Sequence, residues 1–200
     1  MTEESHESSW LERLIHALMR EPKDREQLIE VLRDAKERDL LDANALAMIE
    51  GVLQVSEMQV RDIMVPRAQM VVVQQDAKLE TFLPAVIESS HSRFPVIGEN
   101  RDEVVGILLA KDLVGYAFNS IAAAFSVSSI LRPASFVPES KRLNILLQEF
   151  RNSRNHMAIV VDEYGGVAGL VTIEDVLEQI VGEIEDEYDI DDDDIFIQKH

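Results

Sequence analysis

The feature that most constrains this chain is an internal repeat that begins near Val60. DIMVPRAQMVVV resembles SILRPASFVP, KLETFLPAVIES aligns with KRLNILLQEFRN, RFPVI matches HMAIV, and GILLAKDLV matches GLVTIEDVL. The offset between the copies is 67 residues at Ile63 and Ile130, 64 at Leu79 and Leu143, and 63 over the last two matches. Small changes in loop length account for this drift. The chain therefore contains two copies of one structural unit.

Both copies carry the same order of signals. A short β-rich run is followed by a helix with apolar residues at i, i+3, i+4 and i+7, two apolar strands, and a second helix. The connector DEYGG supplies the glycine pair expected of a hairpin turn between the two strands of the second copy. The strand runs are residues 70–73, 94–97 and 104–109 in the first copy, and 136–137, 157–161 and 167–171 in the second.

Each β-α-β-β-α unit is too small to cover its own sheet, so two units packed face to face would bury both sheets. We therefore predict an α+β fold with pseudo-twofold symmetry, preceded by short helices. The expected divisions are a helical segment at 1–59, a first unit at 60–120, a second unit at 121–184, and an acidic linker or tail at 185–200.

The segment before the repeat predicts two or three helices. A first helix would carry the apolar residues from Trp10 to Leu18, and Asp24 and Asp42 are candidate caps for the next two. Their polar faces mix both signs of charge, which argues against a basic membrane-surface helix. The acidic N-terminus has no apolar signal-peptide core, and no run approaches the ~18 apolar residues of a spanning helix. We expect no direct membrane insertion and a cytoplasmic location.

Composition excludes several classes of function. The chain has 38 acidic residues against 19 Lys and Arg, a formal charge of −19, which argues against nucleic acid as a partner. It has no cysteine, so disulfides and thiolate sites are ruled out, and its five histidines show no metal-ligand spacing. No glycine-rich phosphate loop, H-E-x-x-H or G-x-S-x-G motif is present. We expect neither catalysis nor a protein metal site.

The junction GLVTIED at 169–175 is the strongest candidate site. In one interpretation it is only a capping box, in which Thr172 caps the helix and Asp175 reaches back to the capping N–H. In the other, the hydroxyl and free N–H groups at the helix start bind phosphate, and the adjacent carboxylate accepts hydrogen bonds from ribose hydroxyls. The same geometry serves both interpretations.

Several motifs together resemble a known family. DIMVPR, HSRFPVI, KDL, HMAIVVDEYGG and GLVTIEDVLEQIVGEIEDE, from about Val60 to Asp189, are similar to the CBS domain pair, or Bateman module, of the CorC/HlyC family. That family is described as magnesium and cobalt efflux proteins. The resemblance implies a regulatory, non-catalytic module that binds AMP, or ATP possibly with Mg²⁺, in a cleft between the repeats. A membrane cation transporter is an implied partner.

The resemblance also implies roles for individual residues. Thr172 would meet the phosphate and Asp175 the ribose, with Glu174 in the same set. Arg93 and Arg67 are phosphate candidates, although Arg93 could instead pair with an acidic surface neighbour and Arg67 could be a solvated surface arginine. The backbone of residues 68–71 would contact the adenine edge, and the strand of the first repeat would lie against the base. The remaining implied binding residues are Ala68, Met70, Val71, His91, Ser92, Phe94 and Pro95; the last two could equally be core residues.

The first repeat departs from this pattern. Leu109 stands where the second repeat has Thr172, while Asp112 is retained. We therefore expect one good nucleotide site and one weaker site, formed by Asp112, Met157 and Ala158.

Two further expectations concern the C-terminal part of the chain. Nine of the twelve residues at 183–194 are acidic, which favours a solvated linker over a magnesium site with fixed geometry. The apolar stripe from Val176 to Ile184 predicts a homodimer through the CBS helices. The rival hypothesis is a structural dimerisation scaffold with no ligand, in which Thr172 and Asp175 form only a cap.

Overall fold

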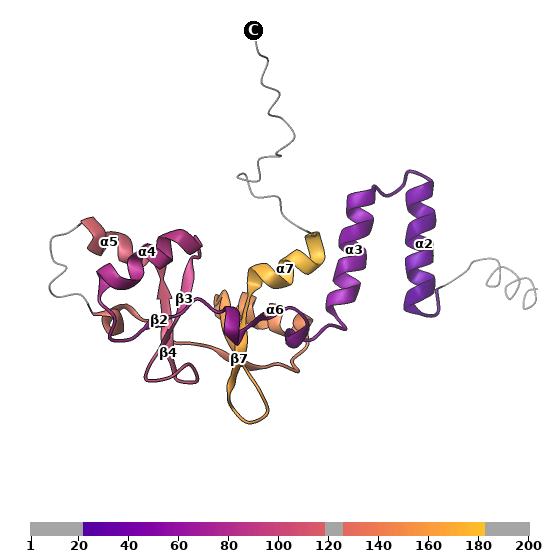
Figure 1. Ribbon diagram of the computed structural model, residues 1–200. Helices are drawn as coiled ribbons and strands as arrows, with labels where there is room; N and C mark the ends of the chain where they lie inside the picture. The colour runs from indigo at the N-terminus through magenta and orange to yellow at the C-terminus, as the bar shows by residue number, and fades with distance from the viewer. Residues whose placement is uncertain (1–21, 119–125, 183–200) are drawn as a thin grey trace, which may run out of the picture. The chain divides into compact units, whose positions relative to one another are not determined.

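A computed structural model describes residues 22–118 and 126–182 (Figure 1). The contacts divide the chain into two units, Met1–Glu50 and Gly51–His200. The helix expected between Trp10 and Leu18 and the acidic segment after Gly182 lie outside the described residues.

The first unit contains α2 (Arg25–Glu37) and the start of α3 (Ala43–Val55). Both predicted caps are confirmed. The carboxylate of Asp24 accepts the N–H of Gln27 at 2.9 Å, and that of Asp42 accepts the N–H of Ala45 at 2.8 Å. These bonds satisfy amide groups that have no partner inside the helix. An ion pair of 3.0 Å joins Arg33 of α2 to Glu50 of α3.

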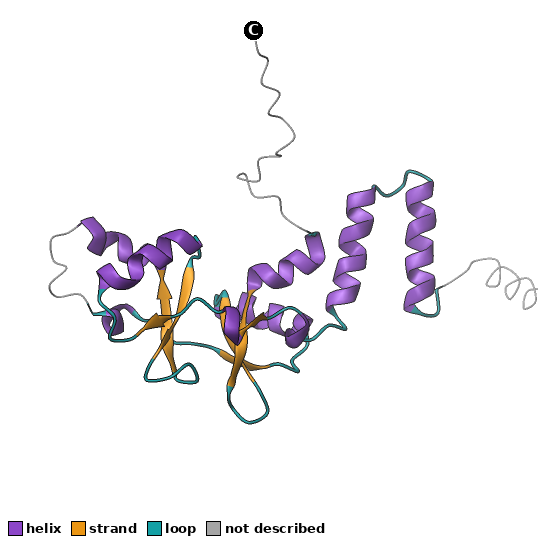
Figure 2. Cartoon of the chain, viewed as in Figure 1, coloured by secondary structure: helices purple, strands orange, loops and turns teal. Residues whose placement is uncertain are grey.

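The second unit contains both repeats, and each has the predicted β-α-β-β-α order (Figure 2). The first comprises β2 (Val73–Gln74), α4 (Leu79–Ser89), β3 (Arg93–Ile97), β4 (Val104–Leu109) and α5 (Ala110–Phe118). The second comprises β5 (Phe136–Pro138), α6 (Leu143–Ser153), β6 (Met157–Val161), β7 (Val167–Thr172) and α7 (Ile173–Val181). Leading segments precede them: η1 (Val60–Asp62), β1 (Val65–Pro66), η2 (Arg67–Gln69) and η4 (Val127–Ile130).

Two sheets form, with strand orders β2-β3-β4 and β1-β7-β6-β5. Within each repeat the first strand is parallel to the second, and the second pairs with the third as an antiparallel hairpin. A parallel pair needs a crossover connection, which α4 and α6 supply. The predicted α+β fold is confirmed.

The repeats exchange their leading segments. β1, which precedes the first repeat, pairs with β7 of the second, so that Val65 lies opposite Leu170. In the equivalent place, Arg132 precedes the second repeat and bridges Ile107 of β4 through two backbone hydrogen bonds of 2.8 and 2.9 Å. Each sheet is thus completed by chain that leads into the other repeat, as pseudo-twofold symmetry requires.

Three hydrophobic clusters explain why the repeats pack together. One is built on the first repeat around Phe94 and Leu108 and also includes Val127, which leads into the second repeat. The other is built on the second repeat around Leu146 and Val171 and also includes Val60, which leads into the first. The third contains residues from both sheets together with Met70 at the end of η2. Its sheet residues are Ile107, Met157, Ile159, Val167 and Leu170. Because side chains alternate along a strand, each sheet contributes to its own core on one face and to the shared cluster on the other.

One alignment made from the sequence is wrong by a residue. The sequence pattern aligns RFPVI with HMAIV, but the strand register makes MAIVV its counterpart. Arg93 lies opposite Leu109, and Met157 lies opposite Thr172, which is the equivalent of Leu109. The counterpart of Arg93 is therefore Met157, and that of Phe94 is Ala158. A one-residue slip reverses the face of every side chain, so this correction bears directly on the site.

A glycine in β7 tests the exchange of leading segments. A Cβ on Gly169 would overlap the backbone carbonyl oxygen of Val65, whereas a Cβ on Gly115 in α5 would meet nothing within 4 Å. We expect Gly169→Ala to lower the free energy of unfolding by about 1–3 kcal/mol, since backbone cannot move as a side chain does. Gly115→Ala should raise it by up to about 1 kcal/mol. Urea unfolding measures both, and a Gly169→Ala variant as stable as the parent would contradict the close approach.

Candidate nucleotide cleft

A cleft of about 320 Å³ opens between the two repeats, within the size range of small-ligand sites. We call it the interrepeat cleft. It brings together eight of the residues expected at the main site: Met70, Val71, His91, Ser92, Arg93, Thr172, Glu174 and Asp175. It is also lined by Val65, Gln69, Ser90, Met157 and Leu170.

Sequence reasoning missed three of these lining residues. Val65 and Leu170 meet only because the leading segments are exchanged, which no local pattern reveals. Ser90 ends α4 in a left-handed conformation with φ 54°, which turns the chain directly into His91 and Ser92. A left-handed residue after a helix is a common stop signal, although glycine or asparagine usually provides it.

The start of α7 contains the predicted capping box. The N–H of Thr172 donates to Asp175 Oδ2 at 2.6 Å, and the N–H of Asp175 donates to Thr172 Oγ1 at 3.2 Å. The cap uses one carboxylate oxygen of Asp175 and the acceptor side of the Thr172 hydroxyl. The other carboxylate oxygen and the hydroxyl proton retain hydrogen-bonding capacity. The cap and a ligand contact are therefore chemically compatible at this helix start.

Opposite charges approach each other across the interrepeat cleft. Arg93 Nη1 of the first repeat lies 3.7 Å from Glu174 Oε1 of the second. Within the second repeat, His156 Nδ1 lies 3.5 Å from the same oxygen, a contact that is an ion pair only when the imidazole is protonated. The Arg93 side chain is 26% exposed and that of Glu174 is 60% exposed. A long, half-exposed pair of this kind is weak. An anionic ligand could therefore recruit the guanidinium without breaking a strong contact.

Three residues expected to bind the base do not line the interrepeat cleft. Phe94 is fully buried in the first repeat's core, where its ring lies 6.1 Å from that of His91. Pro95 is buried in the middle of β3, paired with Ile107. Alternation along β3 turns Phe94 toward the helices of the first repeat and Pro95 toward the opposite face. Both are buried, but only Phe94 belongs to the first repeat's core cluster. Ala68 is exposed on η2, beside lining residues Gln69 and Met70.

The weaker second site is not assembled as expected. Asp112 lines a separate hollow with Ser129, Ile130, Leu131 and Arg132, while Met157 lines the interrepeat cleft instead. Ala158 is buried in the second repeat's core. The register correction explains both outcomes, because Met157 replaces Ala158 on the strand face that turns toward the other repeat.

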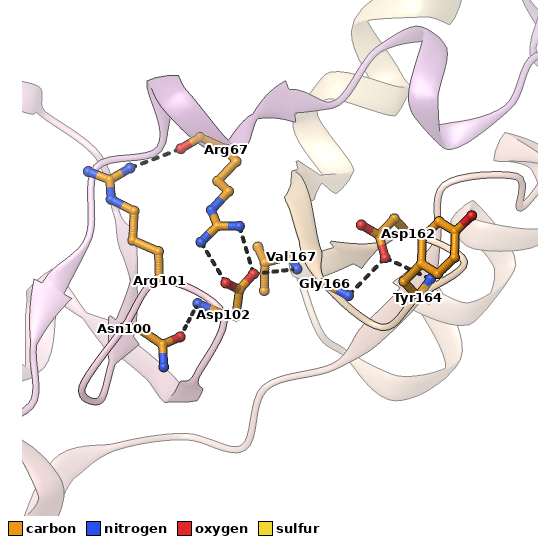
Figure 3. Close-up of polar contacts among 8 residues, drawn as sticks. All are labelled: Arg67, Asn100, Arg101, Asp102, Asp162, Tyr164, Gly166 and Val167. Atoms are coloured by element: carbon orange, nitrogen blue, oxygen red, sulfur yellow. Dashed lines mark hydrogen bonds and ion pairs between the residues drawn. The ribbon is translucent and has the colours of Figure 1, made fainter.

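Arg67 is engaged away from the interrepeat cleft. Its guanidinium makes two contacts of 2.7 Å with the carboxylate of Asp102, and the N–H of Val167 donates to Asp102 at 3.1 Å (Figure 3). Arg101 also donates to the carbonyl of Arg67 at 3.0 Å. The arginine expected at phosphate thus forms a polar clamp between the β3–β4 hairpin of the first repeat and the start of β7.

The same figure shows how the β6–β7 hairpin is held. Asp162 accepts the N–H groups of Tyr164 and Gly166 at 2.9 and 2.8 Å (Figure 3). Gly165, which has no side chain, adopts φ 82° in this Asx turn, as expected of a glycine in the DEYGG connector. The hairpin is confirmed, with no contribution to the interrepeat cleft.

A larger hollow of about 640 Å³ adjoins the interrepeat cleft. It lies against α4 and α5 of the first repeat and shares Ser90, His91, Ser92 and Arg93 with the cleft. Most of its other lining residues are apolar, including Leu83, Val86, Leu113 and Val114.

Within residues 22–118 and 126–182, no group of three or more His, Asp or Glu side chains is placed to hold a metal ion. Over the same ranges, no helix combines the length and apolar character needed to cross a bilayer. The acidic tract that could attract magnesium lies after residue 182, outside these ranges.

Family comparisons agree with the repeat. Residues 60–119 and 127–182 match the CBS domain, and residues 20–55 match a family described as the N-terminal region of NMB0537. A curated relative, the magnesium and cobalt efflux protein CorC of Vibrio cholerae, is 54% identical over 181 residues, which is 90% of this chain. The chain spans 62% of that relative's length.

Solved structures resemble the chain as well. The CBS domain of the bacterial CNNM/CorC family Mg²⁺ transporter in complex with ATP is 48% identical with a TM-score of 0.65, covering 69% of this chain and 97% of that one. A CBS-domain pair from Klebsiella pneumoniae with bound AMP is 29% identical with a TM-score of 0.54, covering 63% of this chain and all of that one.

The clamp at Asp102 predicts a response to pH. Hydrogen bonds from Arg67 and from the backbone of Val167 hold the pKa of Asp102 below its ordinary value of 3.8. A carboxyl with a lowered folded-state pKa stabilises the native state above its unfolded pKa. That contribution is lost as pH falls from about 4 through the lowered pKa. We expect Asp102→Asn to flatten the loss of stability over this acid range, measured by urea unfolding at several pH values. Arg67→Met should flatten it too, and an unchanged acid profile in both variants would contradict the clamp.

Proposed function

This chain belongs to the CBS-domain family as a tandem CBS pair of the CorC type, and from that we propose that it binds an adenine nucleotide in the interrepeat cleft. The observation that carries the proposal is that Thr172 and Asp175 of one repeat and Arg93 of the other line a single cleft. The ATP-bound and AMP-bound CBS structures to which it is similar support the same ligand class.

Each part of a nucleotide has a suitable partner. The α7 N-terminus, the Thr172 hydroxyl and the Arg93 guanidinium suit a phosphate, since amide dipoles and a cation both favour negative charge. The free oxygen of Asp175 suits ribose hydroxyls. Val65, Met70, Val71, Met157 and Leu170 provide an apolar surface for the base. Gln69 and the backbone of η2 add polar groups at its edge.

We further propose that the module regulates magnesium or cobalt efflux from the cytoplasmic side of a membrane. Its similarity to CorC of Vibrio cholerae and to a CNNM/CorC Mg²⁺ transporter supports this role. In this role the module is regulatory and non-catalytic, and nucleotide occupancy is the signal. A membrane cation transporter would receive that signal.

Self-association is the third part of the proposal. Leu177 and Val181 of α7 are 38% and 42% exposed, and the apolar stripe to which they belong is wider than the second repeat's core requires. A homodimer through these helices would cover them. Sedimentation equilibrium should give twice the chain mass, and Leu177→Glu should shift it toward the monomer. A monomeric parent chain at high protein concentration would contradict this part.

The rival function is a structural scaffold that dimerises without a ligand. The capping box alone would then account for Thr172 and Asp175, and Arg93 would be a surface arginine near Glu174. Calorimetric titration with AMP, ADP and ATP, with and without Mg²⁺, distinguishes the two functions. Absence of binding in all six titrations would favour the scaffold.

Arg93 gives the sharpest test because it lies outside the capping box. We expect Arg93→Met to weaken AMP binding about 10- to 100-fold, since a hydrogen bond to a charged group contributes ~1.5–3 kcal/mol. Adenosine, which lacks the phosphate, should bind both chains equally. Arg151→Met, on the exposed last turn of α6, is the matched control and should bind AMP like the parent. Equal AMP affinity in the parent and Arg93→Met would contradict the assigned phosphate position.

A further inference from the structure

The exchange of leading segments places different residues beside the two helix starts. Val65 lies opposite Leu170 on β7, two residues before Thr172. Arg132 lies opposite Ile107 on β4, two residues before Leu109. The two positions are equivalent in the repeat, but one carries a short apolar side chain and the other a long cationic one.

The arginine reaches the carboxylate that is equivalent to Asp175. Arg132 Nη2 lies 3.3 Å from Asp112 Oδ2, and the Asp112 side chain is only 23% exposed. At the equivalent position, Val65 has no group that can pair with Asp175. The carboxylate expected to accept ribose hydroxyls therefore has a cationic partner at the first repeat's helix start, Arg132. Among the residues that the structure describes, Asp175 at the second helix start has no such partner.

We propose that Arg132 is a specificity-determining residue that closes the second nucleotide position by occupying Asp112. This rests on the proposed function, because it concerns how many nucleotides the CBS pair binds. Ribose hydroxyls and the guanidinium compete for the same carboxylate lone pairs. Two backbone hydrogen bonds of 2.8 and 2.9 Å fix the main chain of Arg132 beside β4. The guanidinium, on a side chain that is 61% exposed, is therefore tethered within reach of Asp112 at every ligand concentration.

Arg132 acts separately from the missing hydroxyl at Leu109. Restoring the hydroxyl alone would rebuild the cap but leave Asp112 paired. Removing the arginine alone would free Asp112 but leave the helix start without its hydroxyl. Both changes, a hydroxyl at position 109 and the loss of the arginine at position 132, are therefore needed to create a second site. Only a variant that combines them should bind a second nucleotide.

The test is the calorimetric stoichiometry of AMP for the parent, Leu109→Thr, Arg132→Val and the double variant, with far-ultraviolet circular dichroism to check folding. We expect one nucleotide per chain for the parent and both single variants, and two for the double variant. Adding Asp112→Ala to the double variant should return the stoichiometry to one. Leu109→Thr with Arg132→Gln, which keeps the stem of the arginine, is measured if the valine double variant does not fold.

The outcomes separate this inference from the function on which it rests. Two nucleotides bound by the parent, or by Leu109→Thr alone, would overturn the role of Arg132. One nucleotide bound by every variant, including the folded double variants, would also overturn it while leaving the interrepeat cleft intact. No binding by the parent would instead overturn the proposed function itself.

Discussion

The exchange of leading segments between the two repeats is the interaction on which the rest of the structure depends. Val65 opposite Leu170 and Arg132 opposite Ile107 tie each sheet to chain that leads into the other repeat. The exchange requires a glycine where the segments cross, because a Cβ on Gly106 would come within 2.9 Å of the Arg132 carbonyl oxygen and one on Gly169 would overlap that of Val65. The shared apolar cluster and the interrepeat cleft both follow from this arrangement, since neither repeat alone supplies all of their residues.

The same exchange makes the two halves chemically unequal. Equivalent backbone positions hold Thr172 against Leu109, Arg93 against Met157, and Val65 against Arg132. The first two differences favour an anionic ligand on the side of Thr172, and the third leaves Asp175 without the arginine that pairs with Asp112. Backbone symmetry is therefore retained while binding chemistry is concentrated in one cleft. This suits a sensor, because a single site gives a single occupancy to report.

The repeat was enough to predict the fold, since matched strands and helices in two halves leave few ways to bury both sheets. The caps at Asp24, Asp42 and Thr172 were also visible, because capping is local chemistry. The register between distant strands could not be predicted from the sequence. RFPVI aligns almost equally well with HMAIV and with MAIVV, which begins one residue later, and only the strand pairing shows that Phe94 turns into the core. Arg67 shows the same limit, because its partner Asp102 is distant in sequence and nothing local reveals the clamp.

The central claim is that one nucleotide binds between the repeats and contacts both of them. The most direct measurement is a crystal structure of the chain grown with ATP and Mg²⁺. The account predicts a phosphate at the α7 N-terminus within hydrogen-bonding distance of Thr172 and Arg93, with the ribose on Asp175. A nucleotide that contacts only one repeat, or that leaves Thr172 and Asp175 untouched, would contradict it.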